Sequence, residues 1–234
     1  MLEKQILVDL VAFGVILDDI IFPDGRSELG VLGGGGPQTA FGMRLWSSSV
    51  GLVAGLNQAE APVVQTWLAE SGIDTSGLRV NDLPTPRAWQ LLEEDGRRTQ
   101  VWRVEPPAIA AQLGRSLGNI PADYRRARGF HFGIHPDEPD STFTNVLHSL
   151  GGLVSVEPFK PADSQPSSDQ LQRLLTWVDV FSANLLEARS LVGDGAPDVL
   201  ARRLLEHGAL VVVIRLGALG SLVASREPAV MLHV

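Results

Sequence analysis

Two features of the first fifty residues could do chemistry: the neighbouring carboxylates Asp18 and Asp19, and a run of four glycines at 33–36. Glycine reaches positive φ freely and has no side chain, so such a backbone can turn sharply and approach a ligand closely. Pro37 follows, where the missing N–H of proline suits the first residue of a helix. The pattern predicts a glycine loop that leads into a helix N-terminus, whose free N–H groups are available to polar ligands. An ordinary flexible turn before a helix is the alternative.

The two aspartates follow an apolar segment, residues 6–16, in which Asp9 is the only charged residue. This composition predicts a central strand of a sheet that is covered on both faces. Ligands of open α/β sheets gather at the carboxyl ends of the strands, which is where Asp18 and Asp19 are expected. In an extended chain their side chains point to opposite faces, so only one is expected to face a ligand. A helix cap or a solvated turn is the alternative role.

Two further patterns lie in the last third of the chain. Asn184 and Glu187 are three residues apart, which suits a capping box at a helix start and also suits oxygen ligands for a hydrated Mg²⁺. Arg215 comes shortly before Gly-Ala-Leu-Gly at 217–220. This pair of features predicts either a tight hairpin or a concave group of backbone N–H donors that accepts a phosphate beside the arginine.

The composition excludes several classes of function. The chain has 234 residues, 44% of them hydrophobic and 20% charged, which is enough for one large or two small domains with a sizeable core. A net charge of −8 argues against a nucleic-acid partner. There is no cysteine for disulfides, thiolate metal sites or nucleophilic catalysis, and the five histidines lack the spacing of metal ligands.

Neither a secretory signal nor a membrane-spanning segment is visible in the sequence. The most apolar long window, residues 210–224, contains Arg215 and several glycines, and it is too short to cross a bilayer. We therefore predict that this window forms buried strands, and we expect no membrane partner and a cytoplasmic location.

The elements that must position these residues alternate between strands and helices. Asp-Gly at 95–96 separates two apolar runs within 87–103 and predicts a hairpin, in which Trp89 and Trp102 form either a cross-strand pair or an exposed interface patch. From residue 129 onwards the alternation predicts a mainly parallel sheet with helices on its faces. The expected strands are 50–54, 129–133, 153–156, 177–181, 209–214 and 221–224, and the expected helices are 61–70, 143–150, 171–175, 184–192 and 197–207.

Together these residues resemble the ribokinase/PfkB family of carbohydrate and nucleoside kinases, because four motifs occur in the family's order. The motifs are Gly14-x-x-x-x-Asp19, Gly33-Gly34-x-x-x-Gln38-x-Ala40, Asn184-x-x-Glu187 and Leu216-Gly217-Ala218-x-Gly220. The resemblance implies a three-layer α/β/α fold with a mainly parallel sheet and a small β-sheet lid. It also implies that residues 1–234 form a single incomplete domain of this type, with lid segments at about 20–32 and 85–103.

The resemblance implies roles for individual residues as well. The expected substrate-binding residues are Asp19, Gly33, Gly34, Gly35 and Gln38, and the expected nucleotide-binding residues are Asn184, Glu187, Arg215, Gly217 and Gly220. Glu187 is expected to hold Mg²⁺ indirectly, through water. A complete form would use ATP and Mg²⁺ to phosphorylate a hydroxyl of a sugar or nucleoside-like substrate. Some family members dimerise through the lid, so the resemblance allows a homodimer through this segment, and the oligomeric state stays open.

The sequence departs from the family's pattern in four places. Gln38 replaces the signature Asn, Glu157-Pro158-Phe159 stands where Asp-Pro-Asn is common, and Arg215 replaces a smaller residue. The fourth departure is that the family's Gly-Ala-Gly-Asp motif, which supplies an anion hole and the catalytic base, does not occur among the 234 residues. The resemblance therefore implies that the base would lie beyond Val234, and no residue of the chain is expected to be the catalytic base.

This last departure leads us to expect a C-terminally truncated kinase sequence, inactive or nearly so, because phosphoryl transfer depends on positioning and electrostatic stabilisation. The alternatives are a degenerate, non-catalytic kinase fold with a binding or regulatory role, and a nucleotide-binding α/β domain unrelated to kinases.

Overall fold

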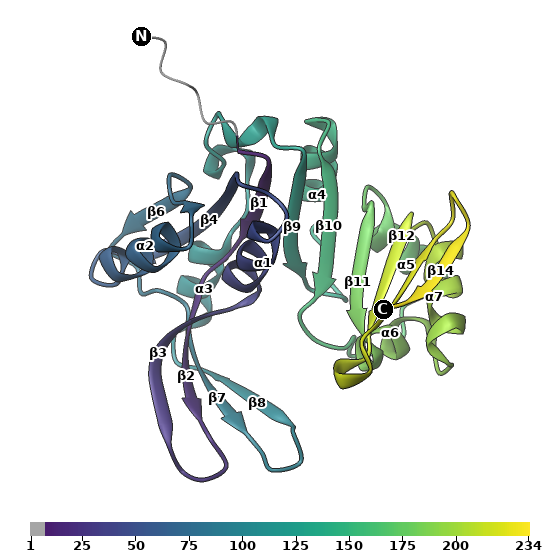
Figure 1. The fold of residues 1–234 in the computed structure, drawn as a ribbon, viewed down its shortest axis with the longest axis horizontal. Helices are drawn as coiled ribbons and strands as arrows, with labels where there is room; N and C mark the ends of the chain where they lie inside the picture. The colour runs from purple at the N-terminus through teal and green to yellow at the C-terminus, as the bar shows by residue number, and fades with distance from the viewer. Residues whose placement is uncertain (1–7) are drawn as a thin grey trace. The chain divides into compact units, whose positions relative to one another are not determined.

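The computed structural model describes residues 8–234, which form two compact units that divide between residues 127 and 128. Each unit contains strands and helices of its own (Figure 1). Part of the strand predicted at 6–16 lies outside the described residues, which begin at Val8. None of the helices found in residues 8–234 is both long and apolar enough to cross a membrane. The assignment of the whole chain to a single domain stays a prediction.

The first unit is built on a parallel sheet in which β4 pairs with three other strands. The strands are β1 (Leu10–Phe13), β4 (Val50–Asn57), β5 (Ile73–Asp74) and β6 (Leu78–Asn81). The helices are α1 (Gly35–Arg44), α2 (Ala61–Glu70) and α3 (Pro106–Leu113), with short 3₁₀ turns η1 (Leu117–Asn119) and η2 (Tyr124–Arg126). Helix α1 packs on β1 and β4, and α3 packs on β4, so that β4 is buried over most of its length.

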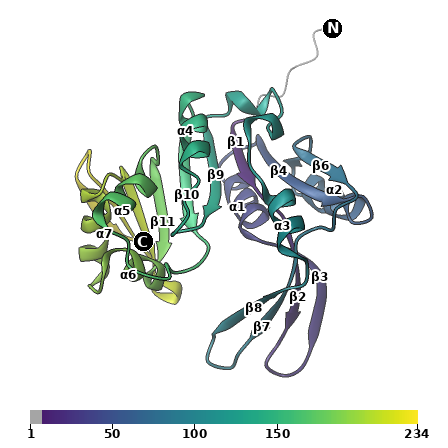
Figure 2. The same ribbon diagram turned by 180° about the vertical axis from the view of Figure 1, so that it is seen from behind.

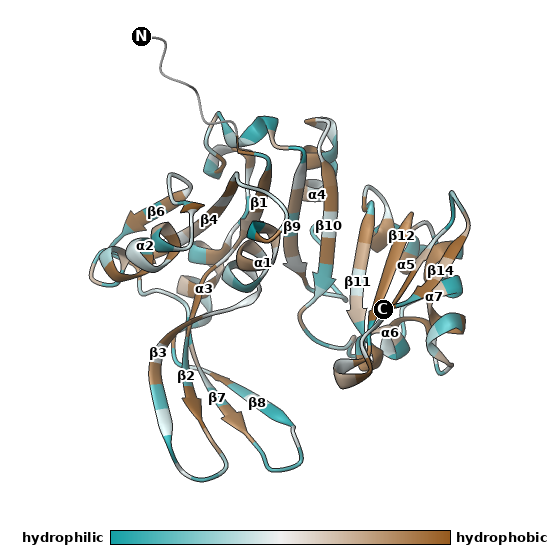
Figure 3. Cartoon of the chain, viewed as in Figure 1, coloured by the Kyte–Doolittle hydropathy of each residue, from teal (hydrophilic) through white to brown (hydrophobic). Residues whose placement is uncertain are grey.

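A second, smaller sheet belongs to the same unit and has the strand order β3-β2-β7-β8. Its strands are β2 (Ile16–Ile21), β3 (Ser27–Gly33), β7 (Arg87–Leu92) and β8 (Arg98–Trp102). Two antiparallel hairpins form this small sheet, and Figures 1 and 2 show them side by side. The predicted hairpin at 87–103 is therefore confirmed. The inner strands β2 and β7 are more hydrophobic than the outer strand β8 (Figure 3).

The single strand predicted at 6–16 is wrong, because the chain changes from one sheet to the other within it. Gly14, with a φ of 88°, separates β1 of the parallel sheet from β2 of the small sheet. Glycine adopts this left-handed conformation without the steric cost that other residues incur. As a consequence, Asp18 and Asp19 lie inside β2 and not at the carboxyl end of a central strand.

The predicted cross-strand pair of tryptophans is also wrong. The register of β7 and β8 places Trp89 opposite Val101 and Trp102 opposite Ala88, so the two indoles lie on opposite faces of the small sheet. The guanidinium carbon of Arg103 lies 4.5 Å from the centre of the Trp89 ring. Trp102 is 41% exposed, which leaves the alternative of an exposed patch.

The second unit has a mainly parallel sheet with the strand order β14-β13-β12-β11-β10-β9. Strands β9 (Gly129–Ile134), β10 (Leu153–Pro158), β11 (Val180–Asn184) and β12 (Val211–Arg215) are parallel, and β13 (Ser221–Ser225) and β14 (Val230–His233) are antiparallel. The helices are α4 (Ser141–Ser149), α5 (Ser168–Leu175), α6 (Leu185–Val192) and α7 (Pro197–Glu206). The predicted α/β class, with a mainly parallel sheet and a small separate sheet, is confirmed.

Two local differences from the predicted elements bear on the second unit. Strand β11 begins at Val180 and not at residue 177, because Trp177 follows α5 with a φ of 65°, outside the extended region. This shift makes Asn184 the last residue of β11. Strand β14 was not predicted, since its apolar run carries no turn or periodicity signal of its own.

Two glycines of helix α1 give a matched test of this packing. A Cβ on Gly36 would overlap the carbonyl oxygen of Gly14, whereas a Cβ on Gly42 would meet no atom within 4 Å. We expect Gly36→Ala to lower the free energy of unfolding by about 2 kcal/mol or more, because the backbone must move apart. Gly42→Ala should raise it by about 0.5–1 kcal/mol, because alanine favours a helix interior. Urea denaturation measures both, and equal effects at the two positions would contradict this packing.

Candidate functional site

The glycine turn, residues 33–36, connects the small sheet to helix α1. Strand β3 ends at Gly33, Gly34 is the N-cap residue with a φ of 83°, and the helix begins at Gly35. The predicted glycine loop leading into a helix is therefore confirmed, although Pro37 is the third residue of the helix and not the first. No acidic residue of the helix itself occupies its first turn, whose N–H groups form the positive end of the helix dipole.

Asp18 lies directly against this turn. A Cβ on Gly33 would overlap its carboxylate, and the N–H of Gly34 donates a hydrogen bond to it. Nε2 of Gln90 donates a second hydrogen bond, to Oδ1, at 2.8 Å. Burial raises the pKa of the Asp18 carboxyl, and the bond from Gln90 acts in the opposite direction. Since a carboxylate offers about four lone-pair positions, these two donors leave it acceptor capacity for a ligand.

Asp19 occupies the other face of β2 and has a different set of partners. Nε and Nη2 of Arg87 donate to its two oxygens at 2.7 Å each, the N–H of Gly30 donates at 2.8 Å, and Nη1 of Arg103 forms a further ion pair. The hydrogen bonds from Arg87 lead in lowering the pKa of the Asp19 carboxyl to about 2. Its side chain is fully buried, and four donors match the roughly four lone pairs of a carboxylate. The carboxylate that the structure brings to the glycine turn is that of Asp18.

The other predicted substrate-binding residues lie together at the start of α1. Gly33, Gly34 and Gly35 form the turn itself, and Gln38 is exposed one turn into the helix. The motif that begins at Gly14 gives Asp19 the role of a substrate ligand, and that role stays a prediction; the pairing of β2 with β3 has a bulge between Asp18 and Ile20.

Three partners of the aspartates were missed by the sequence analysis. Gln90, Arg87 and Arg103 lie between 68 and 84 residues along the chain from the aspartates that they contact. No local pattern predicts such pairs. Arg87 and Gln90 lie on β7, the parallel neighbour of β2, and Arg103 follows β8, which pairs with β7.

The second unit has a separate group of polar residues at the end of β11. Oδ1 of Asn184 accepts the Glu187 N–H at 2.9 Å, and Oε2 of Glu187 accepts the Asn184 N–H at 2.7 Å. This reciprocal pair confirms the capping box that the sequence predicted for the start of α6. Glu187 is only 5% exposed, so its carboxylate is fixed in place.

Arg215 ties this cap to the neighbouring strands. It lies opposite Asn184 in the pairing of β11 with β12. Its guanidinium donates to Glu157 at 2.5 Å, to Ser182 at 2.9 Å and to Glu187 at 3.2 Å. For Glu157, burial alone would raise the carboxyl pKa, but the His131 imidazole, whose Nε2 lies 3.7 Å from Oε1, and the charge of Arg215 outweigh it and lower the pKa. Arg215 therefore links carboxylates from β10 and α6.

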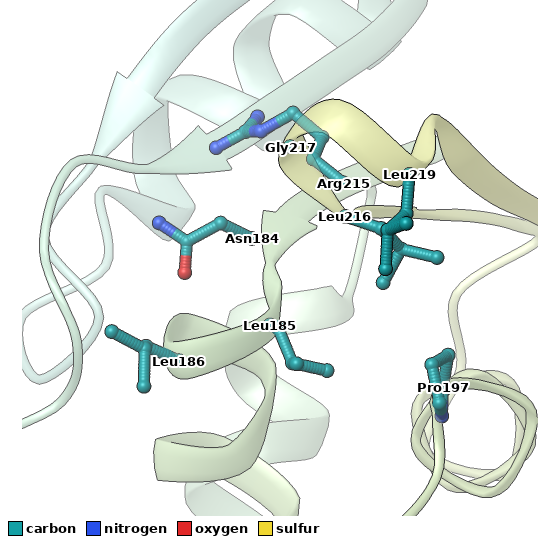
Figure 4. Close-up of a pocket in the computed structure, with 8 residues that line it drawn as sticks. All are labelled: Asn184, Leu185, Leu186, Pro197, Arg215, Leu216, Gly217 and Leu219. Carbon is teal, nitrogen blue, oxygen red and sulfur yellow. The ribbon is translucent and has the colours of Figure 1, made fainter. Parts of the chain in front are cut away.

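A hollow of about 360 Å³ lies beside this group. It is lined by Asn184, Leu185, Leu186, Pro197, Arg215, Leu216, Gly217 and Leu219. Figure 4 shows Asn184 and Arg215 on one side of this hollow and Leu219 and Pro197 on the other. Gly217 and Gly220 both have positive φ, and Arg215 pairs with Ser221 across the turn, so the predicted tight hairpin is confirmed. The hollow thus combines an apolar wall with a cationic edge.

Val234, the residue beyond which the catalytic base was expected, has a structural role next to this turn. Its N–H donates to the carbonyl of Ser221 at 2.8 Å, and its own carbonyl accepts the Ser221 N–H at 2.8 Å. A Cβ on Gly220 would overlap that carbonyl oxygen, so this glycine is needed for close approach of the two strands. Val234 does not line the hollow, and its side chain is 79% exposed. It therefore extends the strand pairing and supplies no catalytic group, while a base beyond Val234 stays a prediction.

The donor set limits what metal site is conceivable here. Within residues 8–234, no three His, Cys, Asp or Glu side chains are grouped closely enough to hold a metal ion between them. Glu157 and Glu187 nevertheless present two carboxylates near one arginine. Mg²⁺ usually keeps several waters and binds through one or two carboxylates plus substrate phosphates. These residues therefore fit an indirectly held, hydrated Mg²⁺ and not a directly ligated one.

Comparison with known proteins gives a consistent result. Residues 30–232 match the sequence pattern of the pfkB family carbohydrate kinases. A cytidine kinase of Thermococcus kodakarensis is 30% identical over 222 residues, which span 93% of this chain and 76% of that protein.

Solved structures give the same result for the fold. The fructokinase of Halothermothrix orenii superimposes with a TM-score of 0.74 at 18% identity, over 97% of this chain and 85% of that one. A ribokinase II of E. coli gives a TM-score of 0.74 at 16% identity, over 97% and 78% of the two chains. At these identities the two structures establish a shared ribokinase-like fold.

The depressed pKa of Asp19 predicts an acid-sensitive small sheet. A carboxyl whose folded-state pKa is about 2, below its ordinary 3.8, stabilises the fold above pH 4. That contribution is lost as the pH falls from about 4 towards 2. We therefore expect Asp19→Asn to lower stability at pH 7, and the difference from wild type to shrink between pH 4 and pH 2. Urea titrations followed by tryptophan fluorescence at several pH values measure it.

Asp24 supplies the control for this prediction. It lies in the turn between β2 and β3, is exposed, and pairs only with its neighbour Arg26 in the described structure. Asp24→Asn should change stability little at any pH. If Asp19→Asn behaved like Asp24→Asn, the ion-pair cluster would have no stabilising role.

Proposed function

The chain belongs to the pfkB family of carbohydrate kinases, and from this premise we propose that it binds a polyhydroxylated substrate in its first unit and a nucleotide in its second. The observation that carries the proposal is the contact of Asp18 with the glycine turn, which places a carboxylate with spare acceptor positions beside free helix N–H groups. The cytidine kinase relative favours a nucleoside as the substrate.

Substrate hydroxyls need acceptors and donors in one place. We infer that Asp18 accepts hydrogen bonds from two hydroxyls and that the N–H groups of the glycine turn donate to their oxygens. Gln38, which is exposed beside the turn, is inferred to supply an amide in place of the family's shorter asparagine. In this proposal Asp19 does not contact the substrate. It helps to position Asp18, because its ion pair with Arg87 holds β2 and β7 in register.

Nucleotide binding is proposed for the hollow in the second unit. Its leucines and Pro197 offer an apolar wall suited to a flat base, and Arg215 supplies a charge for the phosphates. Because Arg215 is now paired with Glu157 and Glu187, phosphate binding would exchange one anionic partner for another. The glycines at 217 and 220 let the backbone of the turn approach the ligand.

The family's Mg²⁺ would be held near Glu187 and Glu157, through water. Bound there, the ion would neutralise charge on the nucleotide phosphates during transfer. The residues of this chain contribute the rest of the arrangement: the cap of α6 fixes the Glu187 carboxylate, and His131 and Arg215 favour the ionised form of Glu157.

The family's catalytic base belongs to a Gly-Ala-Gly-Asp motif, and this motif does not occur in the 234 residues. We therefore propose that this chain binds its ligands but transfers phosphate slowly or not at all. Loss of one oxyanion donor alone commonly costs about 10²- to 10³-fold in rate. The alternative, a non-catalytic binding or regulatory protein, is favoured by Arg215, which occupies the carboxylates near the proposed phosphate site.

A coupled ATP-consumption assay with cytidine, ribose and fructose tests the catalytic part. We expect no turnover above background by the 234-residue chain, together with calorimetric binding of Mg-ATP. Arg215→Met should weaken Mg-ATP binding by about tenfold, the size expected when a hydrogen bond to a charged group is lost. Robust turnover would contradict the proposed inactivity.

Arg202→Met is the matched control, since Arg202 is an exposed arginine of α7 that pairs with Asp198 and is not one of the residues that line the hollow. It should bind Mg-ATP as the wild type does. Equal weakening by both variants would mean that net charge, and not the hollow, governs binding.

A homodimer through the small sheet is also proposed. Every residue of the outer strand β8 is exposed, including Val101 and Trp102. An edge strand with apolar side chains is a ready surface for pairing with a second copy. Sedimentation velocity should show a dimer that Trp102→Gln weakens at least about fivefold, as expected for a tryptophan anchor. A wild-type monomer at every concentration would refute it.

A further inference from the structure

Gln90 is a buried amide at the centre of the small sheet. Strand pairing places it opposite Gln100 of β8, while Ala88, two residues earlier on β7, lies opposite Asp18 of β2. Because side chains alternate along strands, Asp18, Gln90 and Gln100 lie on one face, the face that meets the glycine turn. The Arg87, Arg103 and Asp19 cluster lies on the other.

The hydrogen bonds of Gln90 fix which way its amide points. Nε2 donates to Oδ1 of Asp18 at 2.8 Å and to Oε1 of Gln100 at 3.1 Å. Its Oε1 is buried and has no hydrogen-bond partner among the described residues. A buried acceptor without a partner is unfavourable, and such groups call for an explanation. Because an ionised carboxylate can only accept, the Gln90 amide must turn its N–H group towards Asp18, and this leaves the Gln90 Oε1 without a partner.

This arrangement is selective for one protonation state of Asp18. A carboxylate accepts from the Gln90 amide, whereas a neutral carboxyl can donate and would favour the reversed amide. The bond from Gln90 therefore stabilises the charged form of a carboxyl that burial pushes towards neutrality. Gln90 has no place in the sequence motifs and lies 72 residues from Asp18.

We propose that Gln90 is a positioning residue that keeps Asp18 ionised and directed at the glycine turn, so that this chain binds hydroxyl-donating ligands only while Asp18 is charged. The proposal rests on the proposed function for its ligand, a sugar or nucleoside that donates hydroxyl hydrogens to a carboxylate. It adds a specific consequence: affinity for such ligands falls as the pH becomes weakly acidic, and it falls sooner when Gln90 is replaced.

The other charged groups near Asp18 do not remove this dependence. On β8, Arg98 lowers the pKa of Asp18, and on β2 the charge of Asp19 raises it, both less than burial does. From the glycine turn, the N–H of Gly34 favours the ionised form. Arg87 and Arg103 are bound to Asp19 on the opposite face. Burial has the largest of these effects, so the pKa of Asp18 lies above its ordinary value.

The test compares Gln90→Met with Gln112→Met. Gln112 is another buried amide of the same unit, 1% exposed, whose partners are Asn81 and the carbonyl of Leu83. Both variants lose a buried amide and some stability, but only the first touches Asp18. The side-chain carboxyl carbon of Asp18 is titrated by ¹³C nuclear magnetic resonance between pH 3 and pH 8 in all three proteins, and cytidine and ribose binding is measured calorimetrically over the same range.

We expect the Asp18 midpoint to rise in Gln90→Met and to stay at the wild-type value in Gln112→Met. Ligand affinity at pH 5, relative to pH 8, should fall about tenfold further in Gln90→Met than in the wild type, the effect of one lost hydrogen bond to a charged group. An unmoved midpoint in Gln90→Met, or an equal rise in Gln112→Met, would overturn the role of Gln90.

The same measurements separate the inference from the proposed function. If neither cytidine nor ribose binds any variant at any pH, the proposed ligand class is wrong, while the carbon titration still decides whether Gln90 keeps Asp18 ionised. If ligand binds with an affinity that does not follow the Asp18 titration, the link between Asp18 charge and ligand binding is overturned.

Discussion

The structure of the first unit depends on the absence of side chains at two points of the glycine turn. At Gly33 the missing Cβ leaves room for the carboxylate of Asp18, and at Gly36 it leaves room for the carbonyl of Gly14. These contacts connect the small sheet, the parallel sheet and helix α1 at one place. Any side chain at either position would force the three elements apart, because packed protein interiors tolerate little added volume.

Two adjacent carboxylates of β2 have different roles, because only Asp18 faces the glycine turn. On one face of β2, Asp19 is saturated by arginines and holds the small sheet together, and its pKa is low. On the other face, Asp18 is buried against backbone and amide groups, and its pKa is raised. Neighbouring residues thus acquire different roles because strand geometry gives them different surroundings. In the second unit an arginine also binds carboxylates: Arg215 donates hydrogen bonds to Glu157 and Glu187 at the edge of the hollow.

The sequence predicted the parts of this architecture that have local causes. The glycine turn, the hairpin at 87–103, the capping box of Asn184 with Glu187 and the tight turn after Arg215 all follow from short-range rules. The break at Gly14 was missed, because an unbroken apolar run gives no sign that a chain changes sheets. The partners of Asp18 and Asp19 were also missed, since Gln90, Arg87 and Arg103 reach them only through strand pairing. Motif spacing predicts a substrate role for Asp19. It carries no information about Arg87 and Arg103, which bind the Asp19 carboxylate from elsewhere in the small sheet.

The central claim is that Asp18, beside the glycine turn, receives the ligand, and that Asp19 does not. Side-chain carboxyl ¹³C chemical shifts of both residues, followed during a titration with cytidine at constant pH, test it most directly. The account predicts a saturable change at Asp18 and none at Asp19 beyond the size seen at Asp198 of the second unit. A saturable change at Asp19 with Asp18 unaffected would contradict it.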